Sequence, residues 1–174
     1  MNDATKRIFD VCLGVIGVLI ACFGLWRYFD ERAQDNAAAA QERALALIEE
    51  HGGPAMIEGQ THMHAYWSSH PAFVAHIRTH ALTTGEYAAF VGATFPVSEY
   101  QAEVRAFLMQ TASIFERAQF CDTAGLCDRA LLHAYFCPIA ATTQRVYGPF
   151  FDHLNQEIGA TNIGAGVAQY VESC

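Results

Sequence analysis

The sequence contains little basic charge. It has a single lysine, and its 10 lysine and arginine residues are outnumbered by 18 aspartate and glutamate residues, so the formal net charge is −8. A protein that binds nucleic acid needs a surplus of basic side chains to contact the phosphates. The composition therefore argues against nucleic-acid binding, and we expect no nucleic-acid partner.

The sequence also lacks the short motifs of the common soluble enzymes. It has no phosphate-binding glycine-rich loop, no dinucleotide fingerprint, no Gly-x-Ser-x-Gly elbow and no His-Glu-x-x-His metalloprotease motif. Residue types suited to acid–base catalysis occur at Glu116, Arg117, Asp152, His153 and Glu157. Their spacing does not gather them around one substrate. We therefore expect no enzyme, no catalytic residue, no cofactor and no small-molecule substrate.

No run of alternating apolar and polar residues indicates a β-strand, and no internal repeat is visible. Apolar residues instead recur at steps of three and four, which is the period of a helix with one buried face. The clearest case consists of Tyr100, Val104, Phe107, Leu108, Thr111, Ile114, Ala118 and Cys121. The sequence predicts an all-α fold.

One long apolar run is present near the start of the chain. Fifteen of the nineteen residues from Ile8 to Trp26 are apolar. As a helix this segment would be about 28 Å long, close to the ~30 Å thickness of a bilayer's hydrocarbon core. Basic and aromatic residues suited to the two membrane interfaces flank it, namely Lys6, Arg7, Trp26, Arg27 and Tyr28. We predict a single N-terminal transmembrane anchor at residues 1–29, with the lipid bilayer as a partner.

Three other interpretations of this segment stay open. A cleaved signal peptide is one, although no small-x-small cleavage site follows the apolar run. The residues Leu19–Cys22 resemble a lipoprotein cleavage box, although the chain stays apolar after Cys22. A buried core helix is the third, but charged residues would then be expected along its edges. The basic residues at the two ends nearly balance, so they do not fix the orientation.

Helix-forming residues continue beyond the anchor. Residues 30–53 are mostly good helix formers with few large apolar side chains, which predicts a helical stalk in water. A surface for a partner is the alternative interpretation of the same residues. Glycine and proline at 52–54 end this helix. Residues 54–158 predict a compact bundle of about five helices, interrupted at Pro138 and Pro149. Residues 159–174 form a tail with three glycines and room for one short helix.

Five histidines lie between positions 62 and 80. On a helix, His76 and His80 would share a face and could contact one metal ion, but a third ligand would have to come from elsewhere. A polar surface with neutral imidazoles, or one that responds to pH, explains the same residues.

A second group of candidate metal ligands consists of Cys121, Cys127, His133 and Cys137. Their spacings match neither a zinc finger nor a Cys-x-x-Cys redox site. The turn at Gly125 could instead join Cys121 to Cys127 in a disulfide, which requires an oxidising compartment. Inert core or surface thiols are the simplest explanation of the group.

The order of these segments resembles a broad bacterial family of single-pass membrane proteins that carry a small helical domain of unknown function. The resemblance rests on the apolar helix, the polar helix after it, the patterns at 104–108 and 114–117, the turn before Asp128 and the pair Leu131-Leu132. It implies a protein of the inner (cytoplasmic) membrane with a cytosolic domain. It supplies no catalytic residue.

These features together predict a membrane-anchored helical scaffold or accessory protein that binds a protein partner or associates with itself. Gly14 and Gly17 share a helix face, and the small side chains of Ala37–Ala40 would also allow another helix to approach closely. The alternative is a metal- or redox-dependent protein, tethered to the membrane, that uses the histidine and cysteine clusters.

Overall fold

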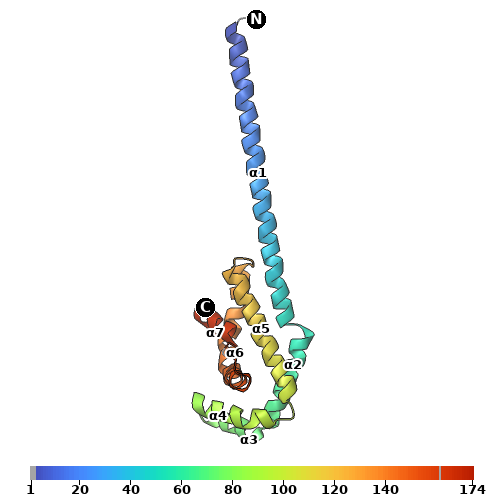
Figure 1. Ribbon diagram of the computed structural model, residues 1–174, viewed down its shortest axis with the longest axis vertical. Helices are drawn as coiled ribbons and strands as arrows, with labels where there is room; N and C mark the ends of the chain where they lie inside the picture. Colours follow the sequence, from blue (N-terminus) through green and yellow to red (C-terminus); the bar gives the residue numbers. More distant parts are fainter. Residues whose placement is uncertain (1–2, 161) are drawn as a thin grey trace. The chain divides into compact units, whose positions relative to one another are not determined.

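The computed structural model describes residues 3–160 and 162–174, with side chains described from Gly17 onward except at Val18. Within these residues the chain forms seven α-helices, one short 3-10 helix and no β-strand (Figure 1), which confirms the predicted all-α fold. The elements are α1 (Asp3–His51), α2 (Pro54–Ser68), α3 (Pro71–Thr79), α4 (Thr84–Thr94), η1 (Phe95–Val97), α5 (Gln101–Thr123), α6 (Arg129–Ile158) and α7 (Ala165–Ser173).

The chain divides into two compact units, Met1–Ala40 and Gln41–Cys174. Among the described residues, none of the helices offers an apolar stretch of the length needed to cross a membrane. Much of the predicted anchor, including Lys6, Arg7 and Gly14, lies outside the residues whose side chains are described. The anchor flanks Trp26 and Tyr28 are exposed on α1.

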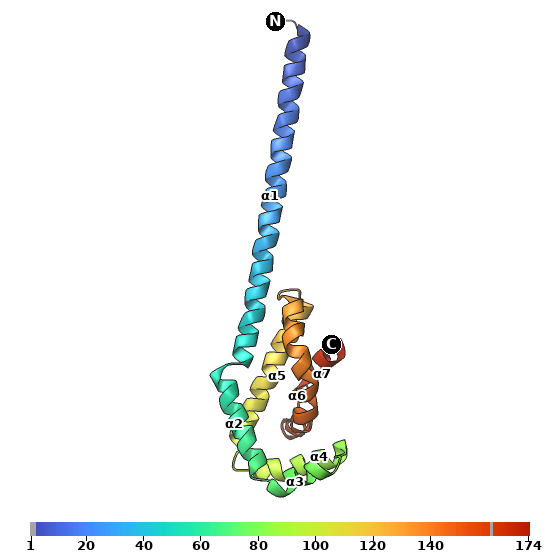
Figure 2. The same ribbon diagram turned by 180° about the vertical axis from the view of Figure 1, so that it is seen from behind.

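Helix α5 is the centre of the second unit, and it contacts α2, α6 and α7 (Figures 1 and 2). The eight predicted core positions, seven in α5 and Tyr100 directly before it, are all buried or half-buried, which confirms the helical period found in the sequence. Aromatic side chains fill much of the core, and Phe115, Phe136 and Tyr170 contact one another edge-on or tilted. Burying a side chain of this size contributes about 1.5–3 kcal/mol to stability, which explains why the helices assemble.

The segment after residue 159 is more than a tail. Helix α7 packs against α5 and α6 and buries Val167 and Tyr170 completely. The close approach depends on Gly166, because a Cβ atom at this position would lie 2.6 Å from the backbone nitrogen of Glu116. Residues 165–173 therefore belong to the folded bundle.

Helix α6 is continuous from Arg129 to Ile158, so the predicted interruption at Pro138 and Pro149 is wrong. A proline inside a helix removes one backbone hydrogen bond and leaves a carbonyl without its partner. Near Pro149 the hydroxyl of Tyr87 donates a hydrogen bond to the carbonyl oxygen of Val146, at 2.5 Å. The carbonyl that loses its partner at Pro149 is that of Arg145, so the bond from Tyr87 does not replace the missing one. Burial of Pro149, Phe150 and Phe151 in the core supports a helix that the sequence alone would end.

Candidate functional site

A groove of about 1130 Å³ lies in the second unit, with α2, α3 and α4 on one side and α6 on the other. Its apolar lining includes Trp67, Phe73, Val74, Ile77 and Pro149. The volume exceeds the ~300–1,000 Å³ of pockets that hold small molecules. The groove is therefore large enough for a segment of another macromolecule.

Helix α3 forms one wall of this groove. None of its residues is fully buried, although Phe73, Val74 and Ile77 lie on one apolar face. Phe73 attaches the helix to its neighbours, because its ring stacks on Phe90 at 3.6 Å between centroids and on Trp67 at 6.2 Å. The remaining apolar face of α3 borders the groove without a partner among the described residues.

The groove also contains a few polar groups. Arg78 on α3 and Arg145 on α6 are exposed in its lining, and neither forms an ion pair within the part of the chain that is described. Asp152 contributes one negative charge. Tyr87 is half-buried, and this burial raises its pKa above the usual value, so the phenol stays neutral and donates to Val146.

His76 and His80 lie on one helix face, as the spacing predicts. Their rings stack with centroids 4.5 Å apart, and both side chains are exposed. The hydroxyl of Thr79 contacts Nδ1 of His80 at 2.8 Å. No third ligand joins this pair among the described residues, so the two histidines alone do not make a transition-metal site.

The predicted cysteine group is divided between two disulfides. Cys121 is bonded to Cys127 across the loop between α5 and α6, which is the pairing that the turn at Gly125 allowed. Cys137 is bonded to Cys174. A metal binds a cysteine through its thiolate, so the oxidised sulfurs do not form the metal site considered from the sequence.

The Cys137–Cys174 bond was missed in the sequence because 37 residues separate the two cysteines. The four cysteines after residue 120 form an even set that allows three pairings. Spacing alone does not choose among these pairings, and Cys174 had no role in the sequence-based prediction. The choice depends on the packing of α7 against α6.

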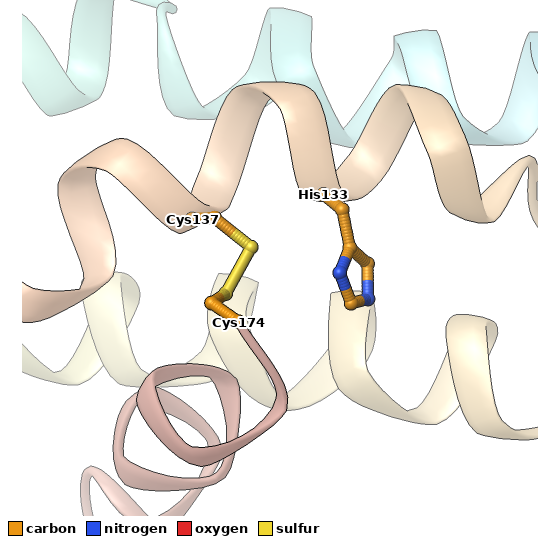
Figure 3. A group of neighbouring side chains, drawn as sticks. All are labelled: His133, Cys137 and Cys174. Carbon is orange, nitrogen blue, oxygen red and sulfur yellow. A yellow bond between two sulfur atoms is a disulfide. The ribbon is translucent and has the colours of Figure 1, made fainter.

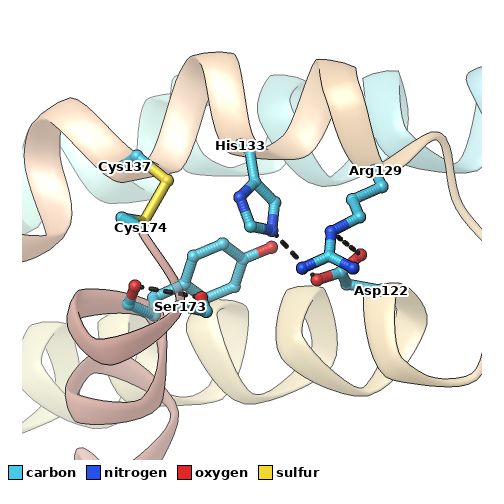
Figure 4. The surroundings of a disulfide bond; sticks show 7 residues. Asp122, Arg129, His133, Cys137, Ser173 and Cys174 are labelled. Atoms are coloured by element: carbon cyan, nitrogen blue, oxygen red, sulfur yellow. Dashed lines mark hydrogen bonds and ion pairs between the residues drawn. A yellow bond between two sulfur atoms is a disulfide. The ribbon is translucent and has the colours of Figure 1, made fainter.

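The second disulfide lies beside a histidine that is paired with an acid (Figures 3 and 4). Ligand atoms of His133, Cys137 and Cys174 lie within 4.8 Å of one another. Nε2 of His133 is 3.0 Å from a carboxylate oxygen of Asp122, whose side chain is only 5% exposed. Arg129 lies 3.6 Å from the other carboxylate oxygen. The structure thus joins two predicted residues, His133 and Cys137, to three that were not predicted as site residues, namely Asp122, Arg129 and Cys174.

Comparisons with protein-family models, with curated proteins and with solved structures find no match for this chain. The resemblance to a bacterial membrane-protein family therefore stays a prediction. A helical fold by itself does not define an activity, so function has to be argued from the groove and from the histidine–cysteine cluster.

Proposed function

We propose that this protein is a membrane-anchored helical scaffold whose folded domain binds an amphipathic helix of a partner protein. The observation that carries this proposal is the groove of about 1130 Å³ beside α3, a helix with an apolar face and no fully buried residue. Amphipathic helices commonly bind by laying their apolar face into such a groove.

The charges of the groove indicate what the partner helix should carry. The lining contains two arginines, Arg78 from α3 and Arg145 from α6, against the single acid Asp152. An apolar stripe with acidic residues beside it would match this lining in both polarity and charge. Complementary charge increases the rate and specificity of association more than its strength.

The proposed anchor rests on the sequence of residues 8–26 and on the side chains described at its far end. Large apolar side chains of α1 are exposed there to between 56% and 67%, at Leu19, Ile20, Phe23, Leu25, Trp26, Tyr28 and Phe29. Such a surface is costly in water, and a bilayer would cover it. We therefore include in the proposal that the chain crosses the membrane once, through this segment.

The two disulfides favour a location of the domain outside the cytosol. Disulfides persist in oxidising compartments and are rare where thiol reductants keep cysteines reduced. We therefore place the domain on the extracytoplasmic side of the membrane, in place of the cytosolic side that the family resemblance implied. The basic residues at the two ends of the anchor nearly balance, so the positive-inside rule does not distinguish this orientation from the opposite one.

A crosslinking experiment with two matched variants tests the groove. Ile77→Asp places a charge in the apolar lining, whereas Ile57→Asp places it at an exposed position of α2 outside the groove. In native membranes, crosslinking of the parent protein should recover a dominant partner, and only Ile77→Asp should lose it. Recovery of the same partner with Ile77→Asp, or of a monomer alone from the parent, would contradict the proposal.

A further inference from the structure

The surroundings of the Cys137–Cys174 disulfide differ from those of a bond that only joins two helices. His133 lies one helical turn before Cys137 on α6 and has one ring nitrogen on the side of the disulfide (Figure 3). Its other nitrogen, Nε2, is held at 3.0 Å by Asp122 (Figure 4). The Sγ atoms of Cys137 and Cys174 and one ring nitrogen of His133 therefore lie close together.

We propose that reduction of the Cys137–Cys174 disulfide creates a metal site for Zn²⁺, with His133 Nδ1 and the two cysteine thiolates as ligands. Two sulfur ligands and one nitrogen ligand form a donor set that zinc prefers. The three atoms already lie within 4.8 Å of one another. A site with three protein ligands leaves a fourth position for water or an external ligand.

The geometry requires only a local change. Two thiolates on one tetrahedral zinc ion lie about 3.8 Å apart, given Zn–S bonds of about 2.3 Å, so the two sulfurs have to separate after reduction. Cys174 is exposed and follows the end of α7, whereas Cys137 is half-buried on α6. Movement of the Cys174 side chain opens the site without displacing the buried Tyr170.

Asp122 supplies the partner that metal-bound histidines usually have. A histidine that binds a metal through one nitrogen commonly donates the proton on its other nitrogen to a carboxylate, which fixes the ring and its tautomer. The Asp122 carboxylate is almost fully buried and is in place on Nε2 of His133. This leaves Nδ1 free to coordinate on the side of the sulfurs.

The redox step needs a dithiol reductant, such as a reduced oxidoreductase of the same compartment. The dithiol transfers two electrons and two protons to the Cys137–Cys174 disulfide, which yields two cysteine thiols and leaves the reductant as a disulfide. Zinc then binds the two sulfurs and His133, and the two thiol protons are released to water. Metal binding thus depends on the redox state of the domain.

The test uses the full chain in detergent micelles with Cys12 and Cys22 changed to serine, and Co²⁺ as a spectroscopic substitute for Zn²⁺. After reduction, we expect one Co²⁺ per chain, with the absorption of tetrahedral thiolate coordination and displacement by Zn²⁺. The oxidised protein should show none of this absorption. His133→Ala should abolish it, and Asp122→Asn should weaken Co²⁺ binding by about 10–100-fold.

Two double variants separate this site from unspecific binding by thiols. Cys121→Ser with Cys127→Ser removes the other disulfide and should keep the Co²⁺ spectrum. Cys137→Ser with Cys174→Ser offers the same number of thiols and should lose it. The proposal would be overturned if the two double variants bound Co²⁺ equally well. It would also be overturned if the reduced parent kept its helical circular dichroism but showed no thiolate absorption with Co²⁺. Loss of helicity on reduction that Zn²⁺ does not restore would overturn it as well.

Discussion

The hydroxyl of Tyr87 on α4 donates a hydrogen bond to the backbone carbonyl of Val146 on α6, at 2.5 Å. This contact joins the two walls of the groove and lies beside the position where Pro149 interrupts the backbone hydrogen bonds of α6. Burial of Tyr87 raises the pKa of its phenol, so the hydroxyl keeps its proton over the physiological range and remains a donor.

Tyr87→Phe should lower the free energy of unfolding by about 0.5–1.5 kcal/mol, because it removes this hydrogen bond and leaves the Val146 carbonyl without that donor. Urea unfolding of the full chain in detergent, followed by circular dichroism, measures the change. Tyr28→Phe is the matched control, since its side chain is 56% exposed. Equal stability of the two variants would show that the contact has no net effect.

Gly166→Ala should destabilise the domain by about 1–3 kcal/mol, because its new Cβ atom would overlap the backbone of α5 at Glu116. Gly92→Ala on α4 is the control, since nothing lies within 4 Å of its Cβ position. That substitution should stabilise the protein by about 0.5–1 kcal/mol through a better helix former. Thermal unfolding of both variants gives the comparison, and an unchanged Gly166→Ala would argue against close packing of α7 on α5.

Stability should fall as the pH drops below about 6.5, in part because of His51. Burial lowers the pKa of this histidine, so the folded protein binds its proton less readily than the unfolded chain does. The contribution of neutral His51 is therefore complete above about 6.5 and is lost as the pH falls below that value. His51 packs edge-on against Phe115 and Phe136 and contacts the hydroxyl of Tyr135 at 3.1 Å.

His51→Gln should reduce the slope of stability against pH in this range, and His76→Gln, at an exposed site of α3, should leave the slope unchanged. Urea midpoints measured at a series of pH values on both sides of 6.5 test the difference. The same slope in His51→Gln and in the parent would assign the effect to other groups.

The location of the domain is open to a labelling test. Val97 is 82% exposed in η1, so Val97→Cys offers an accessible thiol in the folded domain. An extracytoplasmic domain predicts that a membrane-impermeant maleimide labels this thiol in intact cells. Labelling only after the membrane is opened would place the domain in the cytosol. It would contradict the extracytoplasmic location that we infer from the two disulfides.

Some features of the candidate sites could be predicted from the local sequence. The stacked pair His76 and His80 results from helical spacing alone, and the Cys121–Cys127 bond was one of the alternatives that the turn at Gly125 left open. The groove could not be predicted from the local sequence. Its lining comes from four helices, and the sequence gives no measure of how far α3 stands from α6.

The helical fold and the period of α5 were determined by the sequence, because a buried helix face repeats every three or four residues and needs no knowledge of its neighbours. Tertiary structure alone decided that Cys174 meets Cys137 and that Asp122 meets His133. The first contact depends on the packing of α7 against α5 and α6, including the close approach of α7 to α5 at Gly166, and the second depends on how α6 packs against α5 after the loop that joins them. Such packing depends on the shapes of many side chains at once, so it cannot be predicted from a local sequence pattern.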